Sequence, residues 1–230
     1  KDKKEVAEGT MAFYFEKPAG FEFRAGQTID LSLINPSETD EKGITRAYTI
    51  AAAPFEDNLM ITTRIRDSAF KRILNSLSLG SKLNFDGPFG SLILHNNISK
   101  PAVFLTGGIG ITPFRSIILQ ASHDELPHKL FLFYSSRRPE DAPFLEELTN
   151  LKNPNFQFIS TMTQMEKSRY PWEGQRGYIN QTMLSKYVDD LSAPIYYVTG
   201  PPQMVTAMYQ MLVKAGVDSD NIRTEEFAGY

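Results

Sequence analysis

The chain has 230 residues, a formal net charge of -3, 41% hydrophobic and 22% charged residues, so its composition is that of an ordinary globular protein. This length allows two compact domains or one large one. The sequence has no excess of basic residues, so we do not expect a nucleic-acid partner. The sequence contains no cysteine, which excludes disulfides, thiolate-held iron–sulfur clusters and cysteine nucleophiles from it. We expect no metal site.

The sequence also carries no membrane or targeting signal. Its apolar runs stay well below the roughly 18 residues that a membrane-spanning helix needs. Residues 1–8 are too charged for the apolar core of a secretory signal. We therefore expect a soluble monomer without a membrane span. The lack of cysteine favours a cytoplasmic location.

The first half of the chain has the pattern of short strands separated by Gly, Pro, Asn and Asp. One helical pattern, residues 68–77, interrupts it. Six short strands at nearly regular spacing predict a small antiparallel six-stranded β-barrel, as a first domain of residues 1–98. The predicted strands are residues 11–15, 28–34, 46–51, 59–65, 82–85 and 91–94.

The second half alternates apolar runs with amphipathic stretches, which predicts an α/β domain of residues 99–230. Its five strands indicate an open, parallel, five-stranded sheet. The predicted strands are 102–105, 130–134, 156–161, 195–198 and 222–226, and the predicted helices are 114–120, 142–150, 180–188 and 202–215.

A glycine-rich turn joins the first strand and the first helix of this second domain. Glycine allows the backbone to turn tightly and to approach a ligand closely. Thr112 is placed to cap the helix and Pro113 to occupy its first turn, where no N–H is needed. The helix start would then present free N–H groups to a pyrophosphate, although a tight turn with no ligand would use the same residues. The turn comprises Gly107, Gly108, Gly110, Thr112 and Pro113.

Two segments of the first half combine residue types that suit a phosphate and a flat ring. In the strand segment Arg46–Ala47–Tyr48–Thr49, the arginine can pair with a phosphate, the tyrosine can stack on a heterocycle and the threonine can hydrogen-bond a ring nitrogen. Alternation places Arg46 and Tyr48 on one face and Thr49 on the other. By itself the segment is also compatible with an ordinary exposed strand.

The second such segment runs from Arg64 into the predicted helix 68–77, with Asp67 or Ser68 as the cap. It is either another anion-binding helix start or plain helix capping. Farther along, Asp86–Gly90 is predicted to be a hairpin turn.

Near the end of the chain, Thr199–Gly200–Pro201–Pro202 repeats the strand, glycine and helix order of the first glycine turn. Both turns follow parallel strands, so both are expected at the edge of the sheet where ligands bind. The chain then closes with Glu225, Glu226, Phe227 and, after two small residues, Tyr230.

In this order, RAYT, GPFG, GGIGITP, TGPP and an acidic-aromatic terminus resemble the ferredoxin-NADP reductase superfamily over nearly the whole chain. The resemblance implies a flavin-binding barrel followed by a nucleotide-binding sheet. It also implies that NAD(P)H transfers a hydride to FAD and that the flavin then releases electrons one at a time. The flavin supplies the chemistry, and the protein supplies approach geometry and exclusion of water.

The resemblance assigns roles to individual residues. Arg46 would hold the flavin phosphates, Tyr48 would pack on the ring system and Thr49 would lie near the reacting nitrogen. Thr199 stands where many members have cysteine, which leaves its role beside the nicotinamide open. Tyr230 or Phe227 would cover the flavin, and Glu226 or Glu225 would relay a proton.

The implied catalytic residues are Thr49, Thr199, Glu226 and Tyr230. The implied cofactor-binding residues are Arg46, Ala47, Tyr48, Thr49, Arg64, Ser68, Ala69, Phe70, Gly107, Gly108, Gly110, Thr112, Pro113, Ser136, Arg137, Thr199, Gly200, Pro201, Phe227 and Tyr230.

The helix start at Ser68 offers a second phosphate-binding element, which favours FAD over FMN. Arg137 and its neighbour Arg138 stand where members distinguish NADPH from NADH, and either nucleotide stays open. Because the sequence lacks the cysteines of a ferredoxin domain, the electron acceptor is expected to be a separate protein, a ferredoxin or a flavodoxin.

A non-catalytic flavin- and nucleotide-binding regulatory or sensor module would share the same motifs. A nucleotide-binding domain without flavin would leave RAYT unexplained.

Overall fold

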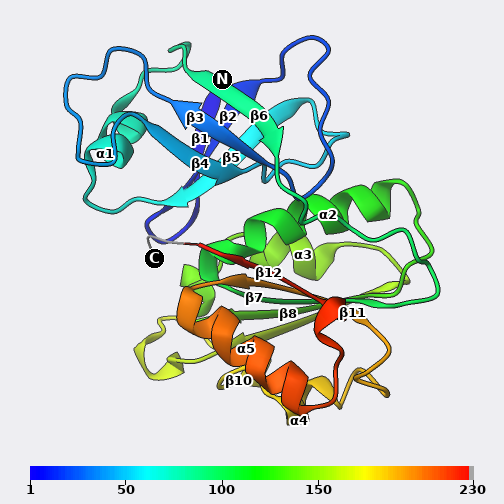
Figure 1. The fold of residues 1–230 in the computed structure, drawn as a ribbon. Coiled ribbons are helices and arrows are strands. Elements are labelled where there is room, and N and C mark those ends of the chain that lie inside the picture. The colour runs from blue at the N-terminus through cyan, green and yellow to red at the C-terminus, as the bar shows by residue number, and fades with distance from the viewer. Residues whose placement is uncertain (228–230) are drawn as a thin grey trace.

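A computed structural model describes residues 1–227 of the chain. Its elements fall into two groups that pack against each other (Figure 1). The N-terminal group contains β1 to β6 and α1, and the C-terminal group contains a parallel sheet with helices on its faces. The predicted domain boundary after residue 98 falls in the connection between the last strand of the first group and the first strand of the second, and it stays a prediction.

The first group is antiparallel, as predicted. Its strands form two three-stranded sheets, β1-β2-β5 and β4-β3-β6, so within residues 1–227 the strand ladders do not describe one closed barrel. Helix α1, Ala69–Ser76, follows β5 and begins with Ser68 as its cap, whose side chain accepts a hydrogen bond from the Lys71 N–H. The strands are β1 Asp2–Ala7, β2 Thr10–Glu16, β3 Thr28–Ser32, β4 Thr45–Thr49, β5 Asn58–Arg64 and β6 Asn84–Phe89.

Six strands were predicted here and six are present, but two of the predictions about them were wrong. Residues 91–94 lie outside the sheets, whereas the charged segment Asp2–Ala7 forms β1 and pairs with β2. The segment Asp86–Gly90 is not a hairpin turn, because its first four residues belong to β6. β6 is an edge strand whose register shifts opposite Ile29. An edge position and an irregular register are what a strand containing glycine and proline requires.

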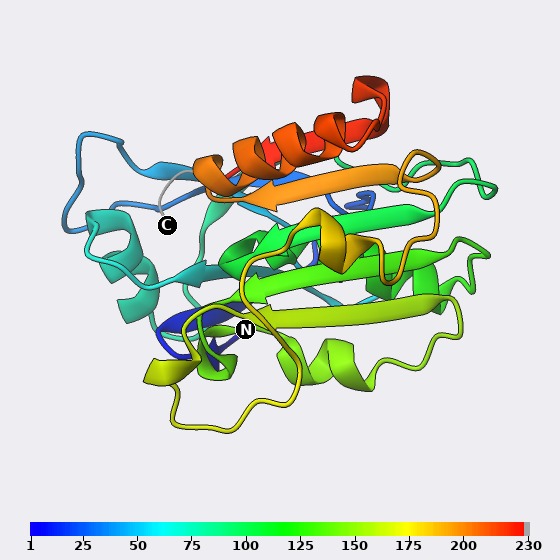
Figure 2. The ribbon, with the colours of Figure 1, turned by 90° about the horizontal axis from the view of Figure 1, so that it is seen from below.

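The second group contains a parallel sheet in the order β10-β9-β8-β7-β11-β12. All five predicted strands are present, and the prediction of five was one short. The sixth strand, β10, has only two residues and pairs with the end of β9. The bounds are β7 Ala102–Gly107, β8 Leu130–Ser136, β9 Phe156–Met162, β10 Gln175–Arg176, β11 Ile195–Gly200 and β12 Ile222–Glu226. In Figure 2 the arrowheads of the long parallel strands all point toward the side on which α1 lies.

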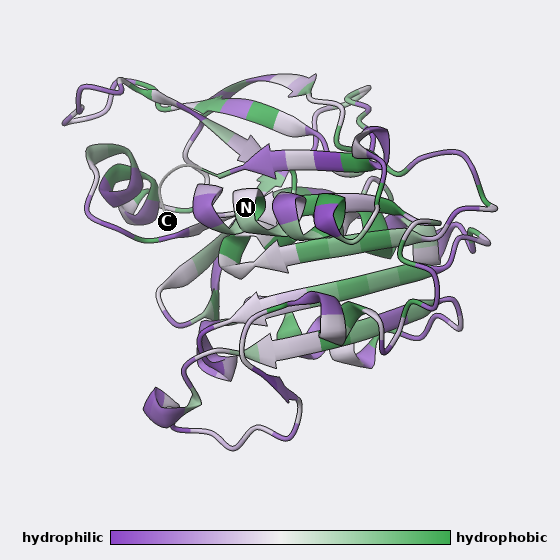
Figure 3. Ribbon diagram, turned by 60° about the horizontal axis from the view of Figure 1, so that its bottom comes forward, coloured by the Kyte–Doolittle hydropathy of each residue, from purple (hydrophilic) through white to green (hydrophobic). Residues whose placement is uncertain are grey.

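Alternation along the buried strands supplies a hydrophobic core on each face of this sheet. On β7, Phe104 packs against residues of α2 and α3, while Val103 and Leu105 pack against residues of α4 and α5. Hydrophobic residues accordingly follow the strands in Figure 3, and the surrounding loops are mostly hydrophilic. The helices are α2 Ile111–His123, α3 Leu145–Asn150, α4 Gln181–Leu184 and α5 Pro202–Lys214.

The start of α2 differs from the prediction. A single 3-10 turn, Gly108–Gly110, precedes the helix, and Gly110 is the N-cap. Thr112 therefore lies inside the first turn and does not cap the helix; its Oγ1 donates to the carbonyl oxygen of Ile109 at 3.2 Å. No helix in the described part of the chain is long and apolar enough to cross a membrane.

Candidate functional site

A cleft of about 790 Å³ lies where the two groups meet. This volume is within the range of about 300–1,000 Å³ that is usual for small-molecule sites. The first group contributes β3, β4, β5 and the start of α1, and the second contributes residues of the first glycine turn and the end of β12. The lining residues are Thr28, Asp40, Glu41, Lys42, Arg46, Ala47, Tyr48, Thr49, Thr62, Thr63, Arg64, Arg66, Asp67, Ser68, Lys71, Ile109, Thr112, Glu225, Glu226 and Phe227.

Arg46 is held in one orientation within this cleft. Its Nη2 forms an ion pair with Asp40 at 2.5 Å, and its Nη1 donates to the carbonyl oxygens of Lys42, Gly43 and Thr45. The guanidinium carbon lies 5.1 Å from the centre of the Phe70 ring, a cation–π distance. These contacts fix a cation beside the start of α1.

Tyr48 and Thr49 provide a ring and a hydroxyl on the same wall. The Tyr48 ring packs 6.0 Å from that of Phe70, and burial raises the pKa of its hydroxyl to about 12, so it stays protonated. The hydroxyl oxygens of Thr49 and Thr62 are buried and have no hydrogen-bond partner within the described residues. Buried polar groups are normally satisfied, so two such hydroxyls lining one cleft indicate a ligand that hydrogen-bonds there.

Positive charge gathers around the start of α1. Burial lowers the pKa of the Lys71 ammonium, and Arg66, Lys42, Arg46 and Arg64 lower it further by repulsion. Such a group of cations next to a helix start is suited to an anion with more than one negative charge.

The two glycine turns of the second group lie against each other. The Oγ1 of Thr199 donates to the carbonyl oxygen of Gly110 at 2.7 Å and lies 3.0 Å from Oγ1 of Thr106. Thr199 is fully buried, so it contacts the turn beneath the cleft and does not line the cleft. A Cβ on Gly110 would lie 3.0 Å from Cα of Gly200, which explains glycine at this position.

The end of β12 forms the remaining wall. The backbone N–H of Phe227 donates to the carbonyl oxygen of Gly200 at 3.0 Å, which places the aromatic residue beside the second glycine turn. Burial raises the pKa of the half-buried Glu225 carboxyl, whereas Glu226 is exposed. Tyr230 lies outside the described residues.

The structure thus brings many of the predicted site residues to one cleft. Ala69 and Phe70 are buried behind it, and Gly107, Gly108, Pro113 and Pro201 belong to the turns beneath it. The predicted residues that line it are Arg46, Ala47, Tyr48, Thr49, Arg64, Ser68, Thr112, Glu226 and Phe227.

Ser136 and Arg137 do not line this cleft. They lie at the end of β8 and contact the segment after β9, because the carbonyl oxygens of Ser136 and Arg137 accept hydrogen bonds from the backbone N–H groups of Thr163 and Gln164. Arg137 is exposed. Arg138 is instead committed to ion pairs with Glu8, Glu140 and Asp141.

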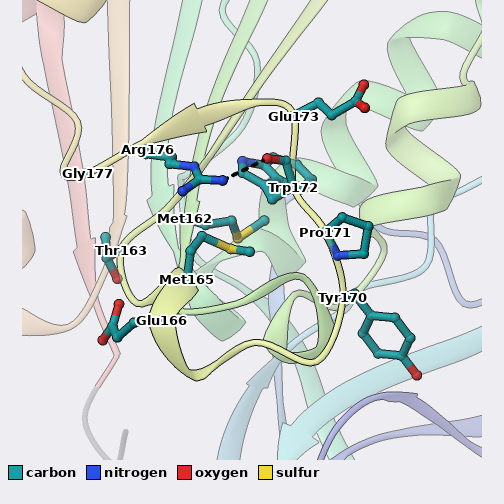
Figure 4. A pocket seen from close by; sticks show the side chains of 10 residues that line it. All are labelled: Met162, Thr163, Met165, Glu166, Tyr170, Pro171, Trp172, Glu173, Arg176 and Gly177. Carbon is teal, nitrogen blue, oxygen red and sulfur yellow. Dashed lines mark hydrogen bonds between the residues drawn. The ribbon is translucent and has the colours of Figure 1, made fainter.

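A second pocket, of about 610 Å³, lies at the ends of β9 and β10 (Figure 4). Met162 and Met165 lie next to each other in it, and the Arg176 guanidinium donates to the carbonyl oxygen of Trp172. The carboxylate of Glu166 lies beside Thr163, and Glu173 points away from the other side chains. No motif in the sequence predicts this pocket, because its residues come from an irregular segment.

Several residues of the main cleft were not predicted from the sequence either. Thr62 and Thr63 follow a run of buried apolar residues on β5 and directly precede Arg64, and that polar pair is a signal that was available. Asp40 and Lys42 lie in a loop, and no pattern in the sequence distinguishes them.

Comparison with known proteins connects this geometry with a family. The model of the "Oxidoreductase NAD-binding domain" family matches residues 104–210. A subunit of the Na(+)-translocating NADH-quinone reductase from Methylococcus capsulatus is 32% identical over 80% of this chain and 49% of that protein. The glycine betaine monooxygenase reductase subunit of Chromohalobacter salexigens is 30% identical over 95% of this chain and 60% of that protein. The chain thus spans less than two thirds of the length of either relative.

Solved structures share the fold over nearly the whole chain. The Amycolatopsis cytochrome P450 reductase GcoB aligns with a TM-score of 0.82 and 20% identity, covering 98% of this chain and 67% of that one. A ferredoxin NADP+ reductase from Neisseria gonorrhoeae, with bound FAD and NADP, aligns with a TM-score of 0.80 and 23% identity, covering 97% and 95%.

Proposed function

We propose that the chain is a flavin oxidoreductase of the ferredoxin-NADP reductase superfamily, which takes a hydride from NAD(P)H and passes the electrons to a separate acceptor. The observation that carries this proposal is the composition of the main cleft. The RAYT strand, a cationic helix start, the first glycine turn and the end of β12 all line it. An oxidoreductase of this class needs a flavin site and a nucleotide site that open onto each other.

The residues of the first group fit FAD. Arg46 and the start of α1 would bind the phosphates, and the unpaired hydroxyls of Thr49 and Thr62 would hydrogen-bond the ring system. The cations around Lys71 support a ligand with two phosphates, which favours FAD over FMN. A bound flavin would supply the redox chemistry: it would accept a hydride, which is two electrons and one proton, from the dihydronicotinamide and leave NAD(P)+ as the product.

The residues of the second group fit the dinucleotide. The two glycine turns stand at the carboxyl ends of β7 and β11, the edge at which open parallel sheets bind nucleotides. The second pocket lies at the same edge, at the end of β9, and its methionine and tryptophan side chains suit the flat adenine ring (Figure 4). The exposed Arg137 beside it would meet a 2'-phosphate if NADPH is the substrate.

The remaining work of the protein is orientation and shielding. Thr199 holds the first glycine turn from beneath, and Phe227 shields the cleft beside the second turn. Glu225, whose pKa burial raises, would hold a proton near the cleft. Electrostatic and positional effects of this kind are all that hydride transfer requires of the protein, because the reacting atoms belong to the flavin and the nucleotide.

The acceptor that we propose is a separate electron-transfer protein, a ferredoxin or a flavodoxin. Two of the relatives are, by their names, a subunit of an NADH-quinone reductase and the reductase subunit of a monooxygenase. Their names are consistent with a reductase that passes electrons to another protein or domain. The location that we propose for the chain is the cytoplasm.

The test is an anaerobic stopped-flow experiment on the purified protein. Its visible spectrum reports bound flavin, and mixing with NADH or NADPH follows the loss of flavin absorbance. Rapid bleaching supports the reductase and identifies the preferred nucleotide. Bound flavin that neither nucleotide reduces would favour a non-catalytic regulatory module, and failure to bind flavin would refute the proposal.

A further inference from the structure

Arg115, on the second turn of α2, forms hydrogen bonds to residues of both groups. It is buried, with a side chain 6% exposed. Its Nη1 donates to Glu56 at 2.8 Å and to the carbonyl oxygen of Ala51 at 2.8 Å, both in the first group. Its Nε and Nη2 donate to Glu147 of α3, in the second group, at 2.7 and 2.6 Å. The ring of Phe144 packs on the guanidinium at 5.0 Å.

The segment that Arg115 binds is the continuation of the RAYT strand. β4 ends at Thr49, and Ala51 follows two residues later. The same helix binds this segment again farther along. Ser116 Oγ donates to the carbonyl oxygen of Ala52 at 2.6 Å, and Gln120 accepts a hydrogen bond from the Phe55 N–H at 3.0 Å. Residues 51–56 therefore lie fixed along α2.

The other end of α2 reaches the nucleotide side of the cleft. Ile109 and Thr112, at the start of the helix, line the same cleft as Tyr48 and Thr49. The first glycine turn thus leads into the start of α2, and one turn later the same helix binds the segment that follows β4.

We propose that Arg115 is a positioning residue, which sets the approach of nicotinamide to flavin by bonding α2 to the segment that follows β4 through Glu56 and Ala51. Arg115 does not line the main cleft, so it would act without touching flavin or nucleotide. This inference rests on the proposed function. The two carboxylates have different roles in this proposal. The ion pair of Arg115 with Glu56 connects the two groups, whereas its ion pair with Glu147 connects α2 to α3 within the second group.

The matched variants are Glu56→Ala and Glu147→Ala. Each variant removes one carboxylate and leaves Arg115 paired with the other. Both variants therefore lose one negative charge beside the Arg115 guanidinium. Glu8→Gln is a further control, because Glu8 also pairs across the groups, with Arg138 and Arg169, neither of which is on α2. Hydride transfer is measured by anaerobic stopped flow, and flavin and nucleotide dissociation constants are measured separately.

We expect Glu56→Ala to slow hydride transfer at saturating nucleotide by about tenfold or more, since a misplacement near 1 Å can cost about 10²-fold. Both dissociation constants should change by less than about twofold, and the long-wavelength absorbance of stacked nicotinamide and flavin should weaken. Glu147→Ala and Glu8→Gln should transfer hydride at the wild-type rate. Glu56→Gln, which keeps hydrogen-bonding oxygen, should recover part of the rate.

Equal rates in wild type, Glu56→Ala and Glu147→Ala would overturn the inference. So would equal slowing in the two alanine variants, because it would show a general structural role. If Glu56→Ala does not fold, Ser116→Ala tests the same link without a charge change, and a wild-type rate and absorbance there would overturn the inference. A wild-type protein that neither nucleotide reduces would instead refute the proposed function.

Discussion

Gly110 and Gly200, which are 90 positions apart in the sequence, touch through their backbones. A Cβ on Gly110 would lie 3.0 Å from both the backbone N and the Cα of Gly200, and 2.8 Å from Oγ1 of Thr106. The φ of Gly110 is -60°, which alanine adopts without strain. Glycine is therefore required here by the approach of the two turns and not by its backbone conformation.

Replacement of Gly110 by alanine should separate the two turns. We expect a loss of about 1–3 kcal/mol in the free energy of unfolding, as for other overpacked sites, and weaker binding of NAD(P)H. Flavin binding should be retained, because the flavin-side residues lie in the first group. Urea unfolding and nucleotide titration measure the two effects. Unchanged nucleotide affinity would contradict the assignment of these turns to the nucleotide.

The Thr199 hydroxyl offers a milder test of the same contact. Thr199→Val keeps the shape and removes the donor to the Gly110 carbonyl oxygen, whereas Thr199→Ser keeps the donor. Leaving a buried acceptor without its partner costs about 1–3 kcal/mol. We expect the valine variant to lose stability and nucleotide affinity, and the serine variant to stay close to wild type in affinity. If serine and valine behave alike, the hydroxyl does not hold the turn.

Arg46 should determine how tightly flavin binds. We expect Arg46→Gln to weaken FAD binding about 10- to 100-fold, because a charge-assisted hydrogen bond contributes about 1.5–3 kcal/mol. Arg24→Gln is the control, since Arg24 is an exposed arginine of the same group and does not line the cleft. Affinity is measured by titrating flavin-free protein with FAD. Equal affinities in the two variants would remove Arg46 from the flavin site.

Much of this architecture could be predicted from the sequence because it depends on local patterns. Apolar runs such as Ala102–Leu105 are buried on both faces, and the glycine turns follow directly from residue types. β1 was missed because its sequence, DKKEVA, is charged, and it forms a strand only by pairing with β2. The two-residue β10 and the pocket around Trp172 depend on contacts between distant segments. Local patterns carry no information about these.

In the functional site, too, local motifs predicted some residues, and others required the structure. Arg46, Tyr48 and Thr49 were identified from one motif, and all three line the cleft. Asp40, which pairs with Arg46, lies in a loop without a motif and required the structure. Thr112 was assigned as a helix cap from its residue type, but the preceding glycines form a 3-10 turn that moves the helix start to Ile111.

Glu225 and Glu226 are neighbours on β12 that differ in exposure, and the burial of Glu225 predicts that this carboxyl makes stability depend on pH. Burial raises the pKa of the Glu225 carboxyl above its ordinary value of 4.5. A raised pKa in the folded state means that folding favours the protonated form. The stability that the neutral carboxyl contributes is therefore fully present below the pKa of the unfolded chain and is lost as pH rises through the folded-state pKa.

The glutamine side chain in Glu225→Gln cannot ionise. The variant should therefore be more stable than wild type at neutral pH and equally stable near pH 4. Glu226→Gln is the matched control, because it removes one carboxylate from the exposed neighbour on the same strand. Urea unfolding of the three proteins at both pH values measures this directly. If Glu225→Gln gives the same difference from wild type at both pH values, its carboxyl does not titrate as burial requires and is unsuited to hold a proton at the cleft.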